Sequence, residues 1–258
     1  MSRTPVVFLT GASKGIGLAI TKILLEEFQA NVATLQRSET PELLELAKTY
    51  NHSLLIFQGS VIDASAVSNA VDLTLKRFSH LDGLILNAGT LTPMGKISDP
   101  SIPLDGWKEL FDVNFFSLVT TLRVTLPVLR KSELGGRVVF VSSSAATGNV
   151  AGWGPYNTSK AAMNSLCRTL AQEEPDVVCV ALRPGAVDTE MQAVVRGQGE
   201  AHMKEDDYKK FIDRHAENTL VKPEESGYVA AALSLGAPQS LSGQFVSWDS
   251  EVCAQFFK

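Results

Sequence analysis

The sequence has few cysteines, and this scarcity excludes a fold held together by disulfides. Its three cysteines, Cys167, Cys179 and Cys253, are odd in number and widely scattered, whereas a disulfide framework needs an even set. The four histidines lack cysteine or acidic partners at the spacing of metal ligands, so we expect no metal site. These absences point away from small secreted domains and from metalloenzymes.

Positive charge and long apolar runs are also lacking. The net charge of -5 provides no basic surface for nucleic acid, and no Lys/Arg-rich run is present to bind an anionic membrane. The first apolar run, Val6 to Leu9, is too short for a signal-peptide core or a membrane span. We therefore expect a cytoplasmic protein without nucleic-acid or membrane partners. Its 258 residues, 45% of them hydrophobic, are enough for a large core.

Short β-rich runs alternate with longer helical stretches along the whole chain. Strands are expected at residues 5–10, 31–35, 53–57, 81–86, 137–141, 177–182 and 244–248, and helices at 16–28, 41–50, 64–78, 104–130, 156–173 and 224–235. This alternation predicts βαβ units. The expected fold is α/β, a Rossmann-type doubly wound parallel sheet of about seven strands with helices on both faces, in a single domain spanning 1–258. A polar, charged stretch at about 190–220 interrupts the alternation after a strand, and we interpret it as a substrate lid.

A glycine-rich turn, Thr10-Gly11-Ala12-Ser13-Lys14-Gly15-Ile16-Gly17, follows the first expected strand and opens a helix. Glycine lets the backbone approach a pyrophosphate closely, and a helix N-terminus favours its negative charge. The spacing G-x-x-x-G-x-G is weak evidence alone, because a tight structural turn could have the same pattern. The strand before it and the helix after it favour dinucleotide binding.

Tyr156 and Lys160 lie four residues apart in an expected helix, so their side chains share one face. A cation about 4 Å from the phenol contributes roughly 4 kcal/mol at an effective dielectric of about 20. That energy could lower the phenol pKa by about three units from its usual value of about 10. The pair therefore predicts proton transfer coupled to hydride transfer, and the alternative is a packed tyrosine beside an exposed lysine.

The ordered set of motifs resembles the short-chain dehydrogenase/reductase family over nearly the whole chain. Besides the glycine turn and Tyr156-x-x-x-Lys160, the resemblance includes Asn87-Ala88-Gly89, Asn114, the serines at 142–144 and Pro184-Gly185. It implies a catalytic set of Asn114, Ser143, Tyr156 and Lys160. In this set Ser143, thirteen residues before Tyr156, would hold the substrate oxygen. Asn114 would support a water-linked proton path to Lys160, although it could also be an ordinary polar residue on a helix face.

The same resemblance implies the residues that contact the cofactor. Lys160 would bind the hydroxyls of the nicotinamide ribose, and Tyr156 lies beside it. Val61 would contact the adenine, and Ser60 before it stands where the family often has Asp. The remaining implied contacts are Gly11, Ser13, Lys14, Gly15, Ile16, Gly17, Asn87, Ala88, Gly89, Pro184, Gly185, Val187 and Thr189.

The end of the second expected strand indicates which cofactor is used. An acidic residue there would bind the ribose 2′-hydroxyl of NAD, but this sequence has Gln36 followed by Arg37. With Lys14 in the glycine turn, two cations and no acid suit a 2′-phosphate. The sequence therefore predicts NADP(H), unless Arg37 and Lys14 are ordinary solvated charges.

The segment 184–192 resembles the branch that contains sepiapterin reductase and the benzil reductases, which reduce one carbonyl of a vicinal dicarbonyl compound. Met94, Trp153 and Met191, with Leu91, could form an apolar wall for aryl ketones or could be ordinary packing. Ser247 occupies the position of the acid that anchors a pterin, which disfavours that substrate.

We expect an NADPH-dependent carbonyl reductase of the benzil-reductase type. The alternatives are reduction of a pterin side-chain carbonyl, oxidation of an alcohol, and a nonenzymatic NADP(H)-binding sensor. The resemblance also implies a homodimer or homotetramer built on the helices after the fourth and fifth strands. Apolar residues on these helices could instead belong to the core of one chain; they are Phe111, Phe115, Phe116, Leu118, Met163 and Leu166.

Overall fold

A seven-stranded sheet forms the centre of the molecule in a computed structural model that describes residues 3–258. The strands lie in the order β3-β2-β1-β4-β5-β6-β7, and every neighbouring pair is parallel. Their bounds are Val6–Thr10 (β1), Asn31–Gln36 (β2), Leu54–Gln58 (β3), Gly83–Leu86 (β4), Gly136–Val141 (β5), Val177–Arg183 (β6) and Phe245–Ser247 (β7). The expected Rossmann-type sheet is confirmed.

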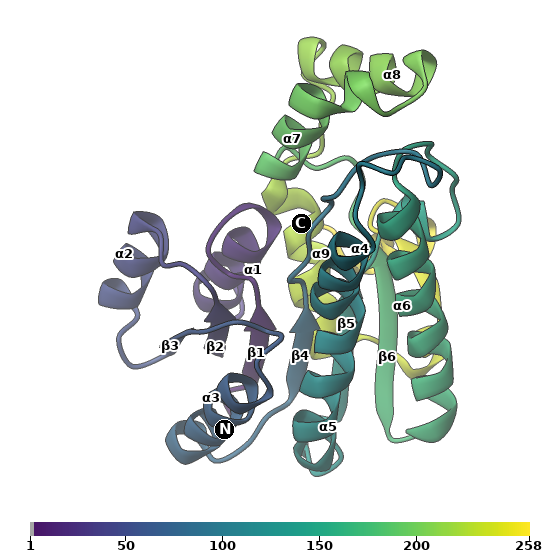
Figure 1. Ribbon diagram of the computed structural model, residues 1–258. Helices are drawn as coiled ribbons and strands as arrows, with labels where there is room; N and C mark the ends of the chain where they lie inside the picture. Colours follow the sequence, from purple (N-terminus) through teal and green to yellow (C-terminus); the bar gives the residue numbers. More distant parts are fainter. Residues whose placement is uncertain (1–2) are drawn as a thin grey trace.

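Helices cover both faces of this sheet, as parallel strands require (Figure 1). The helices that pack on it are α1 (Gly15–Glu26), α2 (Pro41–Thr49), α3 (Ala64–Phe78), α5 (Ser117–Leu129), α6 (Gly154–Glu173) and α9 (Pro223–Gly236). Leu24 of α1 and Val229 of α9 share one apolar cluster with Leu9 of β1. On the opposite face, Leu122 of α5 and Met163 of α6 share a second cluster with the strands. The order of strands reverses between β1 and β4, where such sheets bind ligands beyond the carboxyl ends of their strands.

The helix expected at 104–130 is not one continuous α-helix. It is divided into α4 (Leu104–Phe111), a π-helix at Asp112–Phe116, and α5. The extra residue per turn changes which side chains face inward. As a result Asn114 is buried between the two α-helices.

The stretch Leu104–Leu129 is also long and apolar enough to span a membrane by composition, with a mean hydropathy of 1.2. Its leucines explain this property without a membrane. Leu118, Leu122 and Leu129 are buried against the sheet and neighbouring helices. It is therefore a core helix of the folded chain.

Helices α7 (Glu190–Gln198) and α8 (Glu205–Ala216) project beyond the carboxyl edge of the sheet, at the top of Figure 1. They occupy the stretch expected as a lid. Both ends of this α7–α8 segment meet at one place, because Val187 and Val221 form a parallel bridge. The Asp188 amide donates to the Val221 carbonyl at 2.9 Å, and the Val221 amide donates to the Ala186 carbonyl at 2.9 Å. Within the segment, α8 buries none of its residues.

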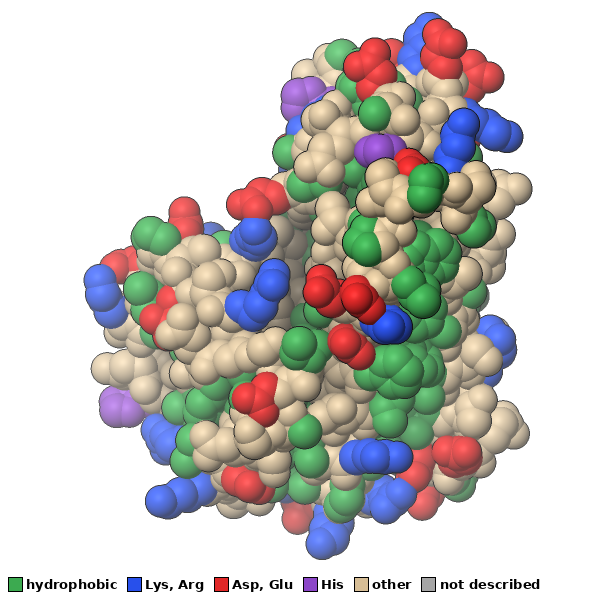
Figure 2. Space-filling model, viewed as in Figure 1, with side chains coloured by type: hydrophobic (Ala, Val, Ile, Leu, Met, Phe, Trp, Pro, Cys, Tyr) green, Lys and Arg blue, Asp and Glu red, His purple; other side chains and the backbone are tan. Residues whose placement is uncertain are grey.

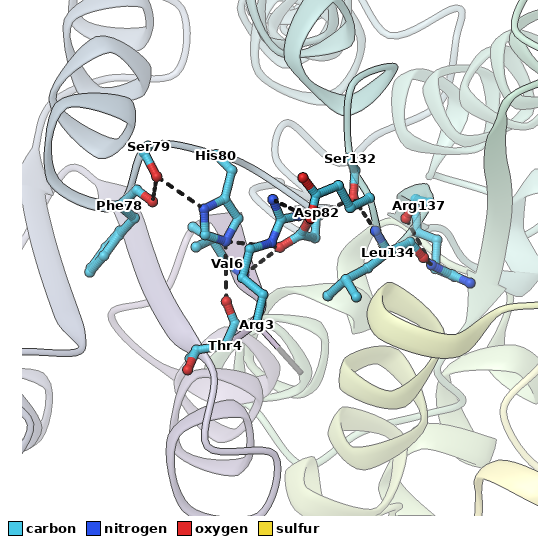
Figure 3. Close-up of polar contacts among 12 residues, drawn as sticks. Arg3, Thr4, Val6, Phe78, Ser79, His80, Asp82, Ser132, Leu134 and Arg137 are labelled. Carbon is cyan, nitrogen blue, oxygen red and sulfur yellow. Dashed lines mark hydrogen bonds and ion pairs between the residues drawn. The ribbon is translucent and has the colours of Figure 1, made fainter. Parts of the chain in front are cut away.

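A buried carboxylate fastens the opposite edge of the sheet (Figure 3). Asp82, directly before β4, is 2% exposed and accepts hydrogen bonds from Arg3 Nη2 at 2.5 Å, the Val6 amide at 3.0 Å and Ser132 Oγ at 2.5 Å. His80 Nε2 lies 3.4 Å from the second carboxylate oxygen. This network joins the start of the chain to β1 and to the turn after α5, at the end of the strands away from the glycine turn.

Candidate active site

The glycine turn joins β1 to α1 and leaves no room for larger residues. Gly11 and Gly15 have positive φ angles of +75° and +56°, which glycine adopts without strain. A Cβ on Gly15 would lie 3.0 Å from Thr189 Cγ2, and one on Gly17 would lie 2.6 Å from Asn87 Nδ2. The turn therefore lies directly against the segments that follow β4 and β6, with its backbone at the N-terminus of α1.

Asn87 and Thr10 fix the turn to the end of β4. Asn87 Nδ2 donates to the Thr10 carbonyl at 3.0 Å and to the Gly11 carbonyl at 2.9 Å. Thr10 Oγ1 accepts from the amides of Asn87 and Ala88 at 3.1 and 3.2 Å. Sequence reasoning placed Asn87 beside a cofactor but missed Thr10, whose position as the last strand residue before the turn was the available signal.

Strand β2 ends at Gln36 and Arg37 follows it, at the position where the sequence predicts contact with the cofactor ribose. Gln36 is buried, and its Nε2 donates to the Phe57 carbonyl at 3.1 Å, whereas the Arg37 side chain is exposed. Val61, after β3, is buried in the apolar cluster that also contains Leu122 of α5 and Met163 of α6. Lys14 is exposed at the glycine turn and forms an ion pair with Glu190 of α7. Figure 2 shows basic and acidic side chains gathered beside the hollow that lies below the α7–α8 segment.

Tyr156 and Ser143 lie together beyond the carboxyl end of β5. Tyr156, in the first turn of α6, is 6% exposed. Ser143 Oγ accepts from the Ala145 amide at 3.1 Å, so its own hydrogen can be donated to the phenol oxygen or to a ligand oxygen. Burial raises the pKa of the Tyr156 phenol, and a hydrogen bond with Ser143 lowers it in part. Near neutral pH the phenol therefore holds its proton.

Lys160 is buried one helical turn beyond Tyr156. It is 4% exposed, its Nζ donates to the Val141 carbonyl at 2.7 Å, and that atom lies 5.8 Å from the centre of the Tyr156 ring. Burial lowers the pKa of the Lys160 amine to about 7. The expected acidification of the phenol is therefore wrong for this structure, because burial disfavours both charged forms and leaves Lys160 only partly charged near neutrality.

Asn114 lies close to Lys160 through the loop after β4. Its Nδ2 donates to the Thr90 carbonyl at 2.8 Å and to Ser159 Oγ at 3.1 Å, and its Oδ1 accepts from the Thr90 amide at 2.8 Å. A Cβ on Gly89 would lie 3.4 Å from Asn114 Oδ1 and 3.8 Å from Lys160 Nζ. Both polar groups thus border Gly89. Sequence reasoning missed Ser159 and Thr90, which hold the Asn114 amide.

Residues 184–189, which follow β6, form the last part of the site at the carboxyl edge of the sheet. Pro184 and Val187 are buried, and Gly185 has a φ of +85° with Trp248 and Val221 beside its Cα. Thr189 faces Gly15 across the start of α1. The segment therefore runs from β6 past the glycine turn and into α7.

An apolar cluster covers Tyr156. Trp153 stands edge-on to the Tyr156 ring, with centroids 5.7 Å apart and planes at 90°, and its other neighbour is Phe211 of α8 at 5.4 Å. The structure brings all three residues expected at the substrate, Met94, Trp153 and Met191, into this cluster. Its other members include Leu91, Leu110, Val195 and Met203. The α7–α8 segment supplies the upper side of this cluster.

These parts form one site at the carboxyl ends of β1, β4, β5 and β6. The glycine turn offers backbone amides and space for a phosphate-bearing ligand. The phenol and the free hydroxyl of Ser143 offer two donors to a carbonyl oxygen placed between them. The site can therefore transfer a proton beneath an apolar cover.

Comparisons with known proteins agree with this geometry. The family model of the short chain dehydrogenase matches residues 5–199. An uncharacterized oxidoreductase of Schizosaccharomyces pombe is 41% identical over 96% of this chain and 97% of its own length. The benzil reductase ((S)-benzoin forming) IRC24 of Saccharomyces cerevisiae is 36% identical over 95% of this chain and 96% of its own length.

A solved structure extends the likeness to three dimensions. The crystal structure of a short chain dehydrogenase/reductase from Saccharomyces cerevisiae superposes with a TM-score of 0.93 at 35% identity, over 98% of this chain and 100% of that chain. The match covers the sheet, the glycine turn and the helix that carries Tyr156. This chain belongs to the short chain dehydrogenase family and is an oxidoreductase of that type.

Proposed function

We propose that the protein is an NADPH-dependent carbonyl reductase that reduces one carbonyl of a vicinal aryl diketone. The observation that carries this proposal is the placement of Tyr156 and Ser143 beneath an apolar cluster, at the same carboxyl edge of the parallel sheet as the glycine turn. The relative named benzil reductase ((S)-benzoin forming) supports the same substrate class. A phenol that holds its proton near neutral pH can serve as the proton donor that carbonyl reduction needs.

The residues present fit a nicotinamide dinucleotide, since the positive φ angles of Gly11 and Gly15 hold the turn at the N-terminus of α1, where backbone amides can meet a phosphate. The turn from Gly11 to Gly17 would hold the pyrophosphate, and Lys14 with Arg37 would hold the 2′-phosphate. Further contacts would come from Ser13, Ile16, Val61, Asn87, Ala88, Gly89, Pro184, Gly185, Val187 and Thr189. When bound, the reduced cofactor supplies the hydride.

Each catalytic side chain has a distinct task in the proposed reaction. Ser143 donates its free hydroxyl hydrogen to the substrate oxygen and orients it. Tyr156 transfers its phenolic proton to that oxygen. Lys160 lies close enough to the ring to stabilise the phenolate that forms, and Asn114, held by Thr90 and Ser159, supports proton return toward Lys160.

An apolar substrate suits the site better than a pterin. Ser247, at the position of the pterin-anchoring acid, accepts from Arg183 Nε at 3.0 Å and Nη2 at 2.9 Å, and it donates to Asp249. Its hydroxyl is therefore committed to protein groups. Trp153, Met94 and Met191 instead present aromatic and thioether surface beside Tyr156, which suits aryl rings.

The α7–α8 segment would act as the substrate lid. Its apolar residues cover Tyr156, so a ketone can reach the phenol only when the segment moves. Helix α8 buries no residue, which makes such motion inexpensive. Opening and closing of this segment would exclude water during the reaction.

We also propose a cytoplasmic homodimer or homotetramer that pairs through the face of α4 to α6. Phe116 is 55% exposed on this face, and a large exposed phenylalanine is suited to a contact between copies. Leu118 and Met163 are buried within the chain, so they belong to the core rather than to such an interface. Sedimentation of the wild type and of Phe116→Lys would test this contact.

The proposed activity is tested by NADPH oxidation with benzil. We expect turnover by the wild type and a loss of about 10²- to 10⁴-fold in kcat for Tyr156→Phe, with NADPH affinity retained. Tyr50→Phe, a tyrosine on the far side of the fold, is the matched control. Tight NADPH binding by the wild type without turnover of any carbonyl would instead identify a nonenzymatic sensor.

A further inference from the structure

The indole N–H of Trp153 is a buried donor without a partner. Trp153 is 7% exposed, and its Nε1 has no hydrogen-bond acceptor among residues 3–258. A buried donor left unpaired is destabilising, so native proteins rarely keep one without a reason. Its neighbours in the apolar cluster, including Leu91, Met94 and Phe211, explain why no strong acceptor is near.

The Trp153 backbone is held firmly on both sides. Gly95 and Trp153 form a parallel bridge, and the Gly95 amide donates to the Gly152 carbonyl at 2.8 Å. The Asn157 amide donates to the Trp153 carbonyl at 2.8 Å, which fixes this residue to the first turn of α6. The Trp153 backbone is therefore anchored by residues outside the α7–α8 segment, and a donor fixed in advance binds with a smaller entropic cost.

The unpaired donor lies next to the proposed proton donor. The Trp153 and Tyr156 rings meet edge to face with centroids 5.7 Å apart, and Ser143 lies near enough to Tyr156 to lower the pKa of its phenol in part. A 1,2-dicarbonyl compound carries two oxygens on adjacent carbons, one for each of these two donor sites. A monoketone would supply one oxygen and leave the indole unpaired.

We propose that the Trp153 N–H donates a hydrogen bond to the second oxygen of a 1,2-dicarbonyl substrate while Tyr156 and Ser143 hold the first. This inference rests on the proposed carbonyl reductase function and makes Trp153 a specificity-determining residue of that site. The two oxygens fix which carbonyl carbon lies beside the phenol. Selectivity for diketones over monoketones follows, because a monoketone leaves a buried donor unsatisfied.

The test compares benzil with deoxybenzoin, which has the same two rings and a single carbonyl. We expect Trp153→Phe to lower kcat/KM for benzil about tenfold, the value of roughly one hydrogen bond, and to change that for deoxybenzoin less than about twofold. Trp107→Phe, on the neighbouring helix α4, is the control with the same change of side chain. Equal losses for both ketones, or no loss for either, would overturn the inference.

Two further measurements test the inference if Trp153→Phe folds poorly. Trp153→3-benzothienylalanine keeps the ring shape but replaces the N–H by sulfur, and it should show the same selective loss. With ¹⁵N-indole labelling, the Trp153 signal of the wild type should move downfield on addition of benzil and not of deoxybenzoin. An unmoved signal would overturn the inference even if benzil is reduced. A wild type that reduces neither ketone would overturn the proposed function, and this inference with it.

Discussion

The Lys14 ammonium forms an ion pair with the Glu190 carboxylate, across 176 residues of sequence. Lys14 belongs to the glycine turn and Glu190 to the first turn of α7. The carboxylate therefore occupies one of the two cations that we assign to a 2′-phosphate. A phosphate on Lys14 would compete with Glu190, so cofactor binding and the attachment of α7 share one charge.

We expect Glu190→Gln to tighten NADPH binding about two- to fivefold, since exposed ion pairs are worth little. The affinity for NADH should stay unchanged, because NADH lacks the phosphate that competes. Isothermal titration of both cofactors measures the effect, with Glu217→Gln, directly after α8, as the control. A parallel change in both affinities would show that Glu190 acts on the shape of the turn rather than on its charge.

Arg37→Asp should weaken NADPH binding about tenfold to a hundredfold, the cost of losing a charge-assisted hydrogen bond and adding repulsion. NADH should be affected by no more than a few fold. The comparison of the two dissociation constants is the measurement, and Arg123→Asp on the exposed side of α5 is the control. Equal losses for both cofactors would contradict the assignment of Arg37 to the 2′-phosphate.

The buried Lys160 predicts a pH-dependent stability. Its pKa is about 7 in the folded chain and near 10.5 when unfolded, so between these values the unfolded state binds more protons. The free energy of unfolding therefore rises with pH across that window. The penalty for burying the charged amine is complete below pH 7 and disappears as the unfolded amine also loses its proton. Relative to Lys160→Met, the wild-type free energy of unfolding should increase by a few kcal/mol between about pH 7 and pH 10.

Denaturant unfolding of both proteins at several pH values measures this difference. The buried cysteines and Tyr156 are common to both proteins, so their titration cancels. A constant difference between the two proteins from pH 7 to pH 10 would show that the amine keeps its ordinary pKa.

Asp82→Asn should lower the free energy of unfolding by about 2–4 kcal/mol, because it leaves Arg3 without its buried counter-charge. The network lies at the edge of the sheet away from Tyr156, so kcat should change by less than about twofold. Chemical denaturation and NADPH oxidation are the two measurements, with the exposed Asp72→Asn as control. A large loss of kcat at unchanged stability would mean that Asp82 acts on the site.

The sequence predicted the sheet and its helices well because local chemistry marks them. Helix α3 begins and ends at the expected residues, since the Asp63 side chain accepts from the amides of Ser65 and Ala66, and Ser79 ends it with a φ of 69°. Strands buried on both faces, such as β6, are continuous apolar runs. The glycine turn, Asn87, Ser143 and Pro184 could be located for the same reason, because each lies just after a strand.

The features that the sequence did not predict depend on the helical repeat or on burial. The π-helix around Asn114 changes the helical repeat, which periodicity assumes to be constant. Helix α8 buries no residue and packs only Tyr208 and Phe211 against the apolar cluster, so its apolar face is short and easily missed. The spacing of Tyr156 and Lys160 placed them together correctly but not their burial, and burial reverses the expected direction of the phenol pKa.

The bridge between Val187 and Val221 has a practical consequence for engineering. Because the chain leaves and re-enters the body at adjacent hydrogen-bonded positions, residues 188–220 form an exchangeable cassette. Grafting the corresponding cassette from a homologue while Thr189 and Glu190 are kept should alter which ketones are accepted, because these two residues are the ones that meet Gly15 and Lys14 of the glycine turn. Changes confined to the segment between Val187 and Val221 would therefore alter substrate specificity while the sheet below stays the same.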